Sequence, residues 1–288
     1  MCFAVLSVII PTYKRSTQLC SILDRILQLQ PAPIEILVHI DAGDSGTYQI
    51  LENKYAGKVS WFQSVTTQGP GGGRNLLVQR ASSPFVVSLD DDSWPLDDDF
   101  FQKAVRLMEQ NPKAGVIATS VTVAGSDAMP TSERIYRASR FENCGCVIRR
   151  DAFLQTRGFL PLRYAYGMEE ADLSLQLLDR GWDILHAEGL RVFHDTGMAH
   201  HASPQVNAAQ ITNTALLAFL RYPVRFWLLG LLQVANRVAY CLKTRRYRGI
   251  LKGIVQIPLT CLKYRNDRVP VTAKTLLTAR RLRKPVTH

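Results

Sequence analysis

The first half of the chain alternates between two hydrophobic patterns. One is the short apolar run rich in β-branched residues, which is typical of a buried strand. Such runs lie at residues 5–10, 34–40, 59–65, 84–89 and 115–123. Between the first two, residues 17–29 carry apolar side chains at positions 19, 22, 23, 26 and 27, which is helical spacing. Strands alternating with helices predict an α/β domain whose sheet is mostly parallel and flanked by helices.

The pattern changes after residue 141. Residues 143–150 predict a further strand, residues 151–155 a short helix, and residues 158–167 a long loop rich in aromatic side chains. An amphipathic helix with an acidic first turn follows at 169–180, and a last strand at 190–193 precedes His194. His194 and the acids of that first turn are candidates both for catalysis and for ordinary structural roles.

Polar, turn-forming residues follow the early strands, where a parallel sheet forms its ligand site. The first strand leads into Pro11-Thr12-Tyr13-Lys14-Arg15, and the second into the segment that holds Asp41 and Asp44. The third leads to a glycine-rich turn at 68–75, which either brings backbone amides to a phosphate or is simply flexible. We expect these ends to converge on one site.

Three consecutive carboxylates, Asp90-Asp91-Asp92, end the fourth predicted strand. Adjacent carboxylates repel one another unless a cation lies among them, and hard oxygen ligands suit Mg²⁺ or Mn²⁺ better than Zn²⁺. The alternative is a solvated turn or a helix cap. Their place at the edge where the other polar ends meet favours the metal site.

The net charge of +11 is concentrated near the C-terminus. Residues 201–288 hold 16 lysines and arginines against one acid, Asp267, whereas residues 1–200 hold 19 bases and 23 acids. Apolar runs at 226–235 and 250–259 lie among these bases, and neither reaches the ~20 uncharged residues that span a bilayer. They predict basic amphipathic helices on an anionic membrane surface, or helices that pack on the body; nucleic acid is not the expected partner.

The N-terminus and the cysteines favour an intracellular protein. Met1 is followed at once by an apolar run, without the basic segment and cleavage site of a signal peptide. The six cysteines have neither zinc-type nor disulfide-type spacing, and Cys144 and Cys146 are expected to be small core residues. We therefore expect a cytoplasmic protein, peripheral on the inner face of the plasma membrane.

Taken in order, these motifs resemble those of a family 2 glycosyltransferase with the GT-A fold, a Rossmann-like sheet flanked by helices. The resemblance covers about residues 5–200. It rests on Ser7-Val-Ile-Ile-Pro-Thr-Tyr-Lys-Arg15, the acid after the second strand, Gly-Gly-Arg74-Asn75, Asp90-Asp91-Asp92, Arg149-Arg150, Glu169-Glu170-Ala-Asp172-Leu173 and His194. It implies a glycosyltransferase domain at 1–200, followed by the basic helical extension at 201–288.

The resemblance also implies roles for individual residues. The donor would be a sugar linked to a nucleoside diphosphate, and the acceptor a hydroxyl of a glycan or a lipid-linked sugar. Asp90 and Asp92 would hold Mg²⁺ or Mn²⁺ with help from His194, and Glu170, with Glu169 beside it, would be the base of an inverting reaction. The nucleotide-sugar site would comprise Pro11, Thr12, Tyr13, Arg15, Asp41, Arg74, Asp90 and Asp91.

One departure and two alternatives stay open. In the family that the chain resembles, a pair of acids followed by Gly-Ser usually ends the second strand. Here residues 39–44 insert or shift a residue, so either Asp41 or Asp44 would meet the nucleoside base. A nucleotidyltransferase shares a similar sheet and acidic site, although no lysine-bearing glycine-rich loop lies near the N-terminus. A non-enzymatic protein that binds membrane or nucleic acid fits the basic tail but not the acidic body.

Overall fold

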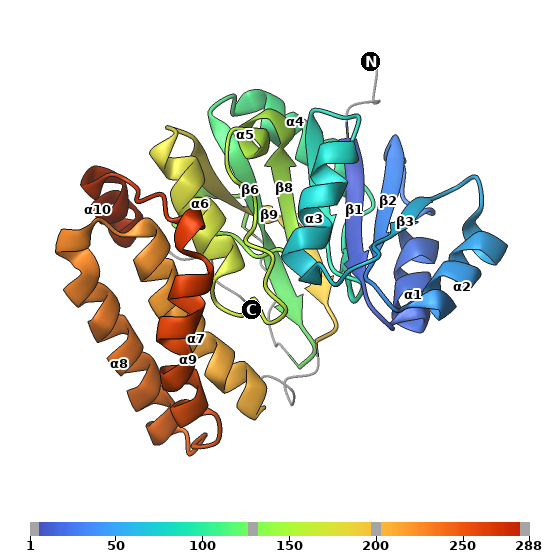
Figure 1. Ribbon diagram of the computed structural model, residues 1–288. Helices are drawn as coiled ribbons and strands as arrows, with labels where there is room; N and C mark the ends of the chain where they lie inside the picture. The colour runs from blue at the N-terminus through green and yellow to red at the C-terminus, as the bar shows by residue number, and fades with distance from the viewer. Residues whose placement is uncertain (1–5, 126–131, 197–202, 283–288) are drawn as a thin grey trace.

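The computed structural model describes residues 6–125, 132–196 and 203–282, and its centre is one nine-stranded sheet (Figure 1). Residue 5 of the first predicted strand and the expected domain boundary near residue 200 lie outside the described ranges. The strands are β1 (Leu6–Thr12), β2 (Glu35–Ile40), β3 (Ser60–Gln63), β4 (Phe85–Leu89), β5 (Ser93–Pro95), β6 (Ala114–Val123), β7 (Ile135–Arg137), β8 (Gly145–Arg149) and β9 (Asp183–His194).

The sheet is mixed, with the order β3-β2-β1-β4-β8-β6-β9-β5 and with β7 paired to β9. Strands β3, β2, β1 and β4 are parallel, as the strand and helix alternation predicts. Strand β8 runs antiparallel between β4 and β6, and β9 runs parallel to β6. Strands β1, β4 and β9 therefore end at the same edge, which brings their C-terminal residues together.

Helices cover both faces of the sheet. They are α1 (Ser16–Ile26), α2 (Ser45–Tyr55), α3 (Gly69–Arg80), α4 (Phe100–Gln110), α5 (Arg150–Leu154) and α6 (Glu169–Asp179). Apolar side chains of α1, α2 and α4 pack in one buried cluster, and those of α3, α5 and α6 in another. Neighbouring strand residues divide between the clusters, for example Val8 and Ile9, because successive side chains point to opposite faces.

The sequence predicted the early strands and helices well but missed part of the later sheet. Strand β9 is longer than the expected 190–193, and β5 and β7 were not predicted. Strand β9 is interrupted by a register shift near Glu188 and Gly189, which breaks its alternating pattern. The glycine-rich segment at 68–75 opens a helix, as expected, but α3 already begins at Gly69, so most of the segment is helical.

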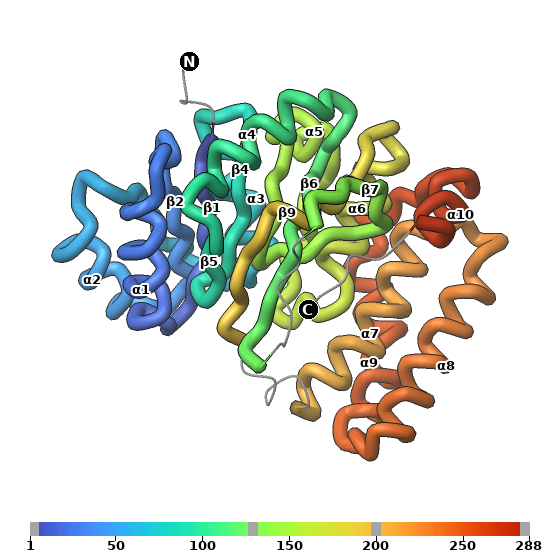
Figure 2. Tube along the Cα trace, turned by 180° about the vertical axis from the view of Figure 1, so that it is seen from behind, coloured from blue at the N-terminus to red at the C-terminus, as the bar shows by residue number. Residues whose placement is uncertain are grey.

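Four helices form an extension beside α6 (Figures 1 and 2). They are α7 (Pro204–Arg221), α8 (Trp227–Lys243), α9 (Ile250–Lys263) and α10 (Ala273–Arg281), with short 3₁₀ turns at Val224–Phe226 and Arg265–Asp267. Helix α7 packs against both α8 and α9. Glycines allow this close approach, since a Cβ on Gly230 would lie 2.4 Å from the Cβ of Ala218. Within the described residues, no helix combines the length and apolar character needed to cross a membrane.

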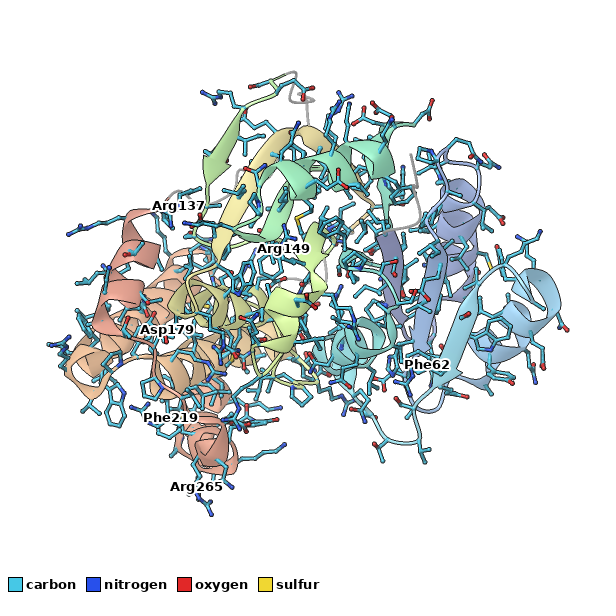
Figure 3. All side chains as sticks on the ribbon, turned by 90° about the horizontal axis from the view of Figure 1, so that it is seen from above. Phe62, Arg137, Arg149, Asp179, Phe219 and Arg265 are labelled. Carbon is cyan, nitrogen blue, oxygen red and sulfur yellow. The ribbon has the colours of Figure 1, made fainter. Side chains whose placement is uncertain are left out.

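Buried polar contacts join this extension to the body. Arg221, at the end of α7, pairs with Asp172 on α6, and both side chains are almost fully buried. The Arg221 guanidinium also donates to the carbonyl oxygen of Asp267, at 3.1 Å. Asp179, on α6, accepts hydrogen bonds from Thr272 and Thr275 at the start of α10. Figure 3 shows Asp179 on the side of the body that meets the helices.

Replacing Arg221 with Met tests how much this junction contributes to the free energy of unfolding. The variant leaves Asp172 charged and buried without its partner, which typically costs about 3–5 kcal/mol of unfolding free energy. The measurement is a urea titration of the full chain. Lys54→Met is the matched control, because it breaks the solvent-exposed pair with Asp24 and should leave the unfolding free energy nearly unchanged. Equal losses in the two variants would contradict the importance of the junction.

Candidate active site

A cavity of about 900 Å³ opens at the edge where β1, β4 and β9 end. Every site residue predicted from the sequence lines it. They are Pro11, Thr12, Tyr13, Arg15, Asp41, Arg74, Asp90, Asp91, Asp92, Glu169, Glu170 and His194. The fold thus brings residues from six separate segments of the chain to one place.

Two aspartates, Asp90 and Asp92, each form an ion pair with an arginine through one carboxylate oxygen. Arg74 pairs with Oδ1 of Asp90, and Arg15 donates to Oδ2 of Asp92 at 2.6 Å. Arg74 is itself buried, and its Nε donates to the hydroxyl of Ser88 at 3.0 Å. The arginines therefore fix the orientation of both carboxylates and leave one oxygen of each for another partner.

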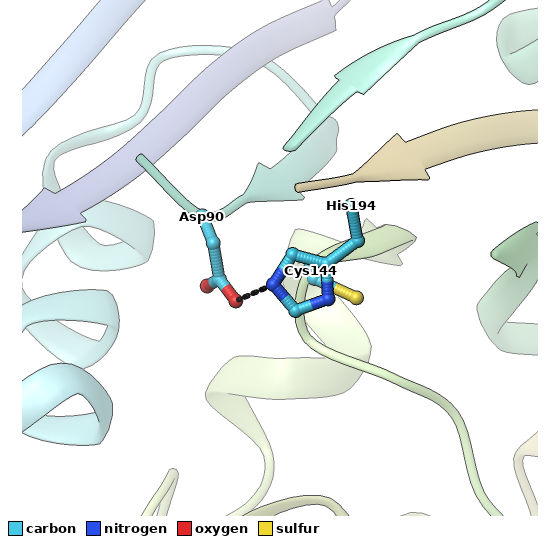
Figure 4. Close-up of side chains that lie close together, drawn as sticks. All are labelled: Asp90, Cys144 and His194. Atoms are coloured by element: carbon cyan, nitrogen blue, oxygen red, sulfur yellow. Dashed lines mark ion pairs between the residues drawn. The ribbon is translucent and has the colours of Figure 1, made fainter. Parts of the chain in front are cut away.

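The remaining oxygens face the imidazole of His194, the last residue of β9. Its Nε2 lies 3.1 Å from Oδ1 of Asp92. The same nitrogen lies 3.7 Å from Oδ2 of Asp90 (Figure 4). Burial alone would lower the pKa of His194, but the two aspartates outweigh it and raise the pKa. Burial would likewise raise the pKa of Asp92, yet His194 and Arg15 outweigh it and lower the pKa.

Asp90, Asp92 and His194 fit a divalent cation. Oδ1 of Asp92 is buried and has no hydrogen-bond partner among the described residues, so a carboxylate oxygen is left with unused acceptor capacity beside the imidazole. Two carboxylates and one histidine form a donor set that Mn²⁺ accepts, and such sites retain open positions for a ligand. These three residues are therefore the candidate metal ligands.

Asp91 differs from its neighbours because protein groups occupy both of its oxygens. Oδ2 accepts a hydrogen bond from the Thr12 hydroxyl at 2.7 Å, and Oδ1 lies 2.7 Å from the Arg15 guanidinium. Burial raises the pKa of Asp91 to about 7 despite these contacts. Asp91 thus ties the end of β1 to the end of β4.

Helix α6 begins with two glutamates, which differ in their burial. Glu169 is buried, with Oε2 accepting from the Asn143 amide at 3.3 Å and lying 3.9 Å from Arg74. Glu170 is half-buried. Burial raises the pKa of Glu169 to about 8 and also raises the pKa of Glu170. Both carboxyl groups are therefore better proton acceptors than an ordinary glutamate.

The glycine-rich start of α3 packs closely against the site. A Cβ on Gly71 would lie 2.5 Å from Oε1 of Glu169, and one on Gly73 would lie 2.5 Å from Nδ1 of His39. Glycines are required here by packing. The first backbone amides of α3 are occupied as well, because Gln68 and Gly69 both donate to the carboxylate of Asp41, at 2.8 and 3.0 Å.

The two candidate acids after β2 have distinct positions. Asp41 lines the cavity while it caps α3. Asp44 caps α2 by accepting from the Thr47 amide, and it also accepts from the Lys14 amide at 2.6 Å. Of these two acids, only Asp41 lines the cavity.

Several further cavity residues carry no signature in the sequence that assigns them a role. They are Arg140, Glu142, Asn143, Cys144, Arg163, Tyr164 and Tyr166. They lie in loops without regular hydrophobic spacing, so no periodic signal marks them. Cys144 and Cys146 are both buried, as predicted; Cys146 packs in the apolar cluster of α3, α5 and α6, whereas Cys144 also lines the cavity. Arg149 and Arg150, in contrast, donate to backbone carbonyls of the body.

Sequence comparison identifies a family and two relatives. Residues 7–163, more than half of the chain, match the family Glycosyl transferase family 2. An uncharacterized glycosyltransferase of Haemophilus influenzae is 24% identical over 188 residues, covering 60% of this chain and 62% of that protein. The GalNAc(5)-diNAcBac-PP-undecaprenol β-1,3-glucosyltransferase of Campylobacter jejuni is 30% identical over 113 residues, covering 38% and 35%. The matches thus span less than two thirds of either relative.

Solved structures share the fold. GalNAc-T7 with UDP, GalNAc and Mn²⁺ superposes with a TM-score of 0.61 at 15% identity, covering 77% of this chain and 48% of that one. The mannosyltransferase PcManGT of Pyrobaculum calidifontis, in complex with GDP-Man and Mn²⁺, gives 0.60 at 15% identity, covering 96% and 83%. TarS 1–349 of S. aureus gives 0.58 at 15% identity, covering 88% and 80%. These similarities confirm the predicted GT-A fold.

The family match over the sheet and the GT-A fold agree with one another, and we conclude that this chain belongs to glycosyl transferase family 2.

Proposed function

We propose that the protein is a metal-dependent, inverting glycosyltransferase that moves a sugar from a nucleoside diphosphate to an acceptor hydroxyl. The observation that carries this proposal is the composition of one cavity. It has two oriented carboxylates and an imidazole that fit a cation, and a half-buried glutamate of raised pKa. Family membership favours sugar transfer over nucleotidyl transfer and over a purely binding role.

The leaving group of such a reaction is a diphosphate whose negative charge increases as it departs. A divalent cation, when bound, supplies Lewis acidity that stabilises this charge. Asp90, Asp92 and His194 would hold it, and Arg15 and Arg74 keep the two aspartates in place. Two of the structural relatives were solved with Mn²⁺, which supports a divalent cation without deciding between Mn²⁺ and Mg²⁺.

Glu170 is proposed as the base that removes the proton of the acceptor hydroxyl. Glu170 is a half-buried residue that lines the cavity, whereas Glu169 is buried beside Gly71 and near Arg74. Glu169 would then stabilise Arg74 and, through it, Asp90. A single base opposite the leaving group gives inversion at the anomeric carbon.

Pro11, Thr12, Tyr13 and Asp41 line the part of the cavity proposed for the nucleotide. Relatives of this fold were solved with UDP-GlcNAc and with GDP-Man, so either kind of donor is compatible with it. The name of the Campylobacter relative specifies an acceptor on undecaprenyl diphosphate. A glycan or lipid-linked sugar is therefore the acceptor class that we propose.

Replacing Glu170 with Gln tests the proposed base. Removing a general base typically lowers kcat by ~10²–10⁴-fold, and Glu169→Gln, its matched control, should lower kcat much less. The assay is release of nucleoside diphosphate from a panel of nucleotide sugars with Mn²⁺ and an acceptor. Release of pyrophosphate in place of nucleoside diphosphate would indicate a nucleotidyltransferase, and full activity of Glu170→Gln would exclude Glu170 as the base.

The pH dependence of kcat/KM is a second readout of the same assignment. A base works as a carboxylate, so activity falls as the pH drops through its pKa. Because burial raises the pKa of Glu170, this loss should occur above ~4.3, the ordinary glutamate value. Glu169→Gln should keep the same acid limb. If that limb disappears in Glu169→Gln, Glu169 is the base.

We also propose that helices α8 and α9, the core of a membrane-associating segment at 201–288, attach the enzyme peripherally to the inner face of the plasma membrane. These helices expose a row of large apolar side chains to solvent, including Leu231 at 66% and Leu251 at 75% exposure. Arg245, Arg248 and Lys252 are exposed beside them. This combination supports an interfacial helix pair on anionic lipid, where each base near the surface contributes ~1 kcal/mol.

Flotation of the full chain with lipid vesicles tests this attachment. We expect binding to vesicles containing anionic lipid, weaker binding to zwitterionic vesicles, and release by high salt. The triple variant Leu228→Glu, Leu231→Glu, Leu251→Glu should lose binding. Val65→Glu, at a body residue that is 98% exposed, should retain it. Unchanged flotation of the triple variant would contradict the proposed surface.

A further inference from the structure

The thiol of Cys144 lies among the candidate metal ligands. Its Sγ, a carboxylate oxygen of Asp90 and a ring nitrogen of His194 all lie within 4.8 Å of one another. Figure 4 shows the three side chains approaching one another from separate segments of the chain. Cys144 directly precedes β8, Asp90 follows β4 and His194 ends β9, so the sheet itself sets their spacing.

The neighbouring carboxylate of Asp92 also faces His194. Asp92 is only 7% exposed, and its Oδ1 lies 3.1 Å from Nε2 of His194 without a hydrogen-bond partner among the described residues. Arg15 and Arg74 contact the opposite oxygens of Asp92 and Asp90. The two arginines therefore compensate the carboxylates without taking the oxygens that face His194.

The donor set differs from that of a purely hard-cation site. Mg²⁺ binds oxygen ligands, whereas sulfur, nitrogen and oxygen together are the ligands of Zn²⁺ and similar softer cations. Asp90, Asp92 and His194 suffice for Mn²⁺ or Mg²⁺. A buried thiol adds nothing to the binding of Mg²⁺, but it adds a strong ligand for a thiophilic cation.

We propose that Asp90, Cys144 and His194 form a binding site for a thiophilic divalent cation of the Zn²⁺ class. On binding, the Cys144 thiol gives its proton to solvent and its sulfur bonds the cation, with no change of oxidation state. Because a hard cation would use Asp90 and His194 as well, the two kinds of cation exclude each other. That exclusion rests on the proposed function, whereas the thiophilic site itself does not.

Cys146 provides a matched comparison. It lies two residues after Cys144, within β8, is fully buried, and packs with apolar side chains. Cys146 is not part of the cluster with Asp90 and His194. Serine at either position makes the same small change of side chain, so a difference between the variants reports the position of the sulfur.

Cobalt absorption tests the site without any sugar donor. Co²⁺ is titrated into the metal-free full chain as a visible substitute for Zn²⁺. We expect a near-ultraviolet band from sulfur-to-cobalt charge transfer, which saturates with one ion per chain and disappears when Zn²⁺ is added. The band should be lost in Cys144→Ser and retained in Cys146→Ser.

Absence of the band in the parent protein, or its persistence in Cys144→Ser, would overturn the proposal. Circular dichroism and the thermal midpoint check that each variant is folded, and Cys144→Ala replaces Cys144→Ser if the serine is not tolerated. Activity supplies a separate check on the exclusion of hard cations. Zn²⁺ should compete with Mn²⁺ in the parent and much less in the Cys144 variants. Since absorption needs no turnover, failure of the thiophilic site and failure of the proposed function give different results.

Discussion

The three aspartates at the end of β4 must be neutralised, and much of the surrounding structure performs that task. Three adjacent carboxylates in a mostly buried position repel one another strongly and lose hydration. Arg15, from the end of β1, contacts Asp91 and Asp92, and Arg74, from α3, contacts Asp90. His194 reaches the remaining oxygens from the end of β9. The ends of three strands and one helix are thereby joined through a single acidic segment.

This requirement explains features that would otherwise look unrelated. Arg74 reaches Asp90 because α3 packs closely on the sheet, and that packing depends on Gly71 and Gly73 having no side chain. Asp41 holds the start of α3 in place through the amides of Gln68 and Gly69. The same arginines that compensate the charge leave one oxygen of Asp90 and of Asp92 turned toward His194. Charge compensation and the candidate cation site are thus two aspects of one arrangement.

Much of the fold and site could be predicted from the sequence because strand ends carry local signals. Apolar runs revealed β1, β2 and β4, and the polar residues after them proved to line one cavity. Contacts that depend on the tertiary fold had no such signal. Glu142 and Tyr164 lie in loops, and Arg221 pairs with Asp172 from 49 residues away. The position of Cys144 beside His194 follows from the pairing of β8 with β4, which no local pattern specifies.

The central claim is that Asp90, Asp92 and His194 hold a cation that in turn holds a nucleoside diphosphate. Isothermal titration of UDP and GDP into the full chain, with and without Mn²⁺, tests it directly. We expect one nucleotide to bind at least tenfold more tightly when Mn²⁺ is present, which corresponds to about 1.4 kcal/mol. Asp92→Asn should abolish this enhancement. Equal affinity with and without Mn²⁺, or an undiminished enhancement in Asp92→Asn, would contradict it.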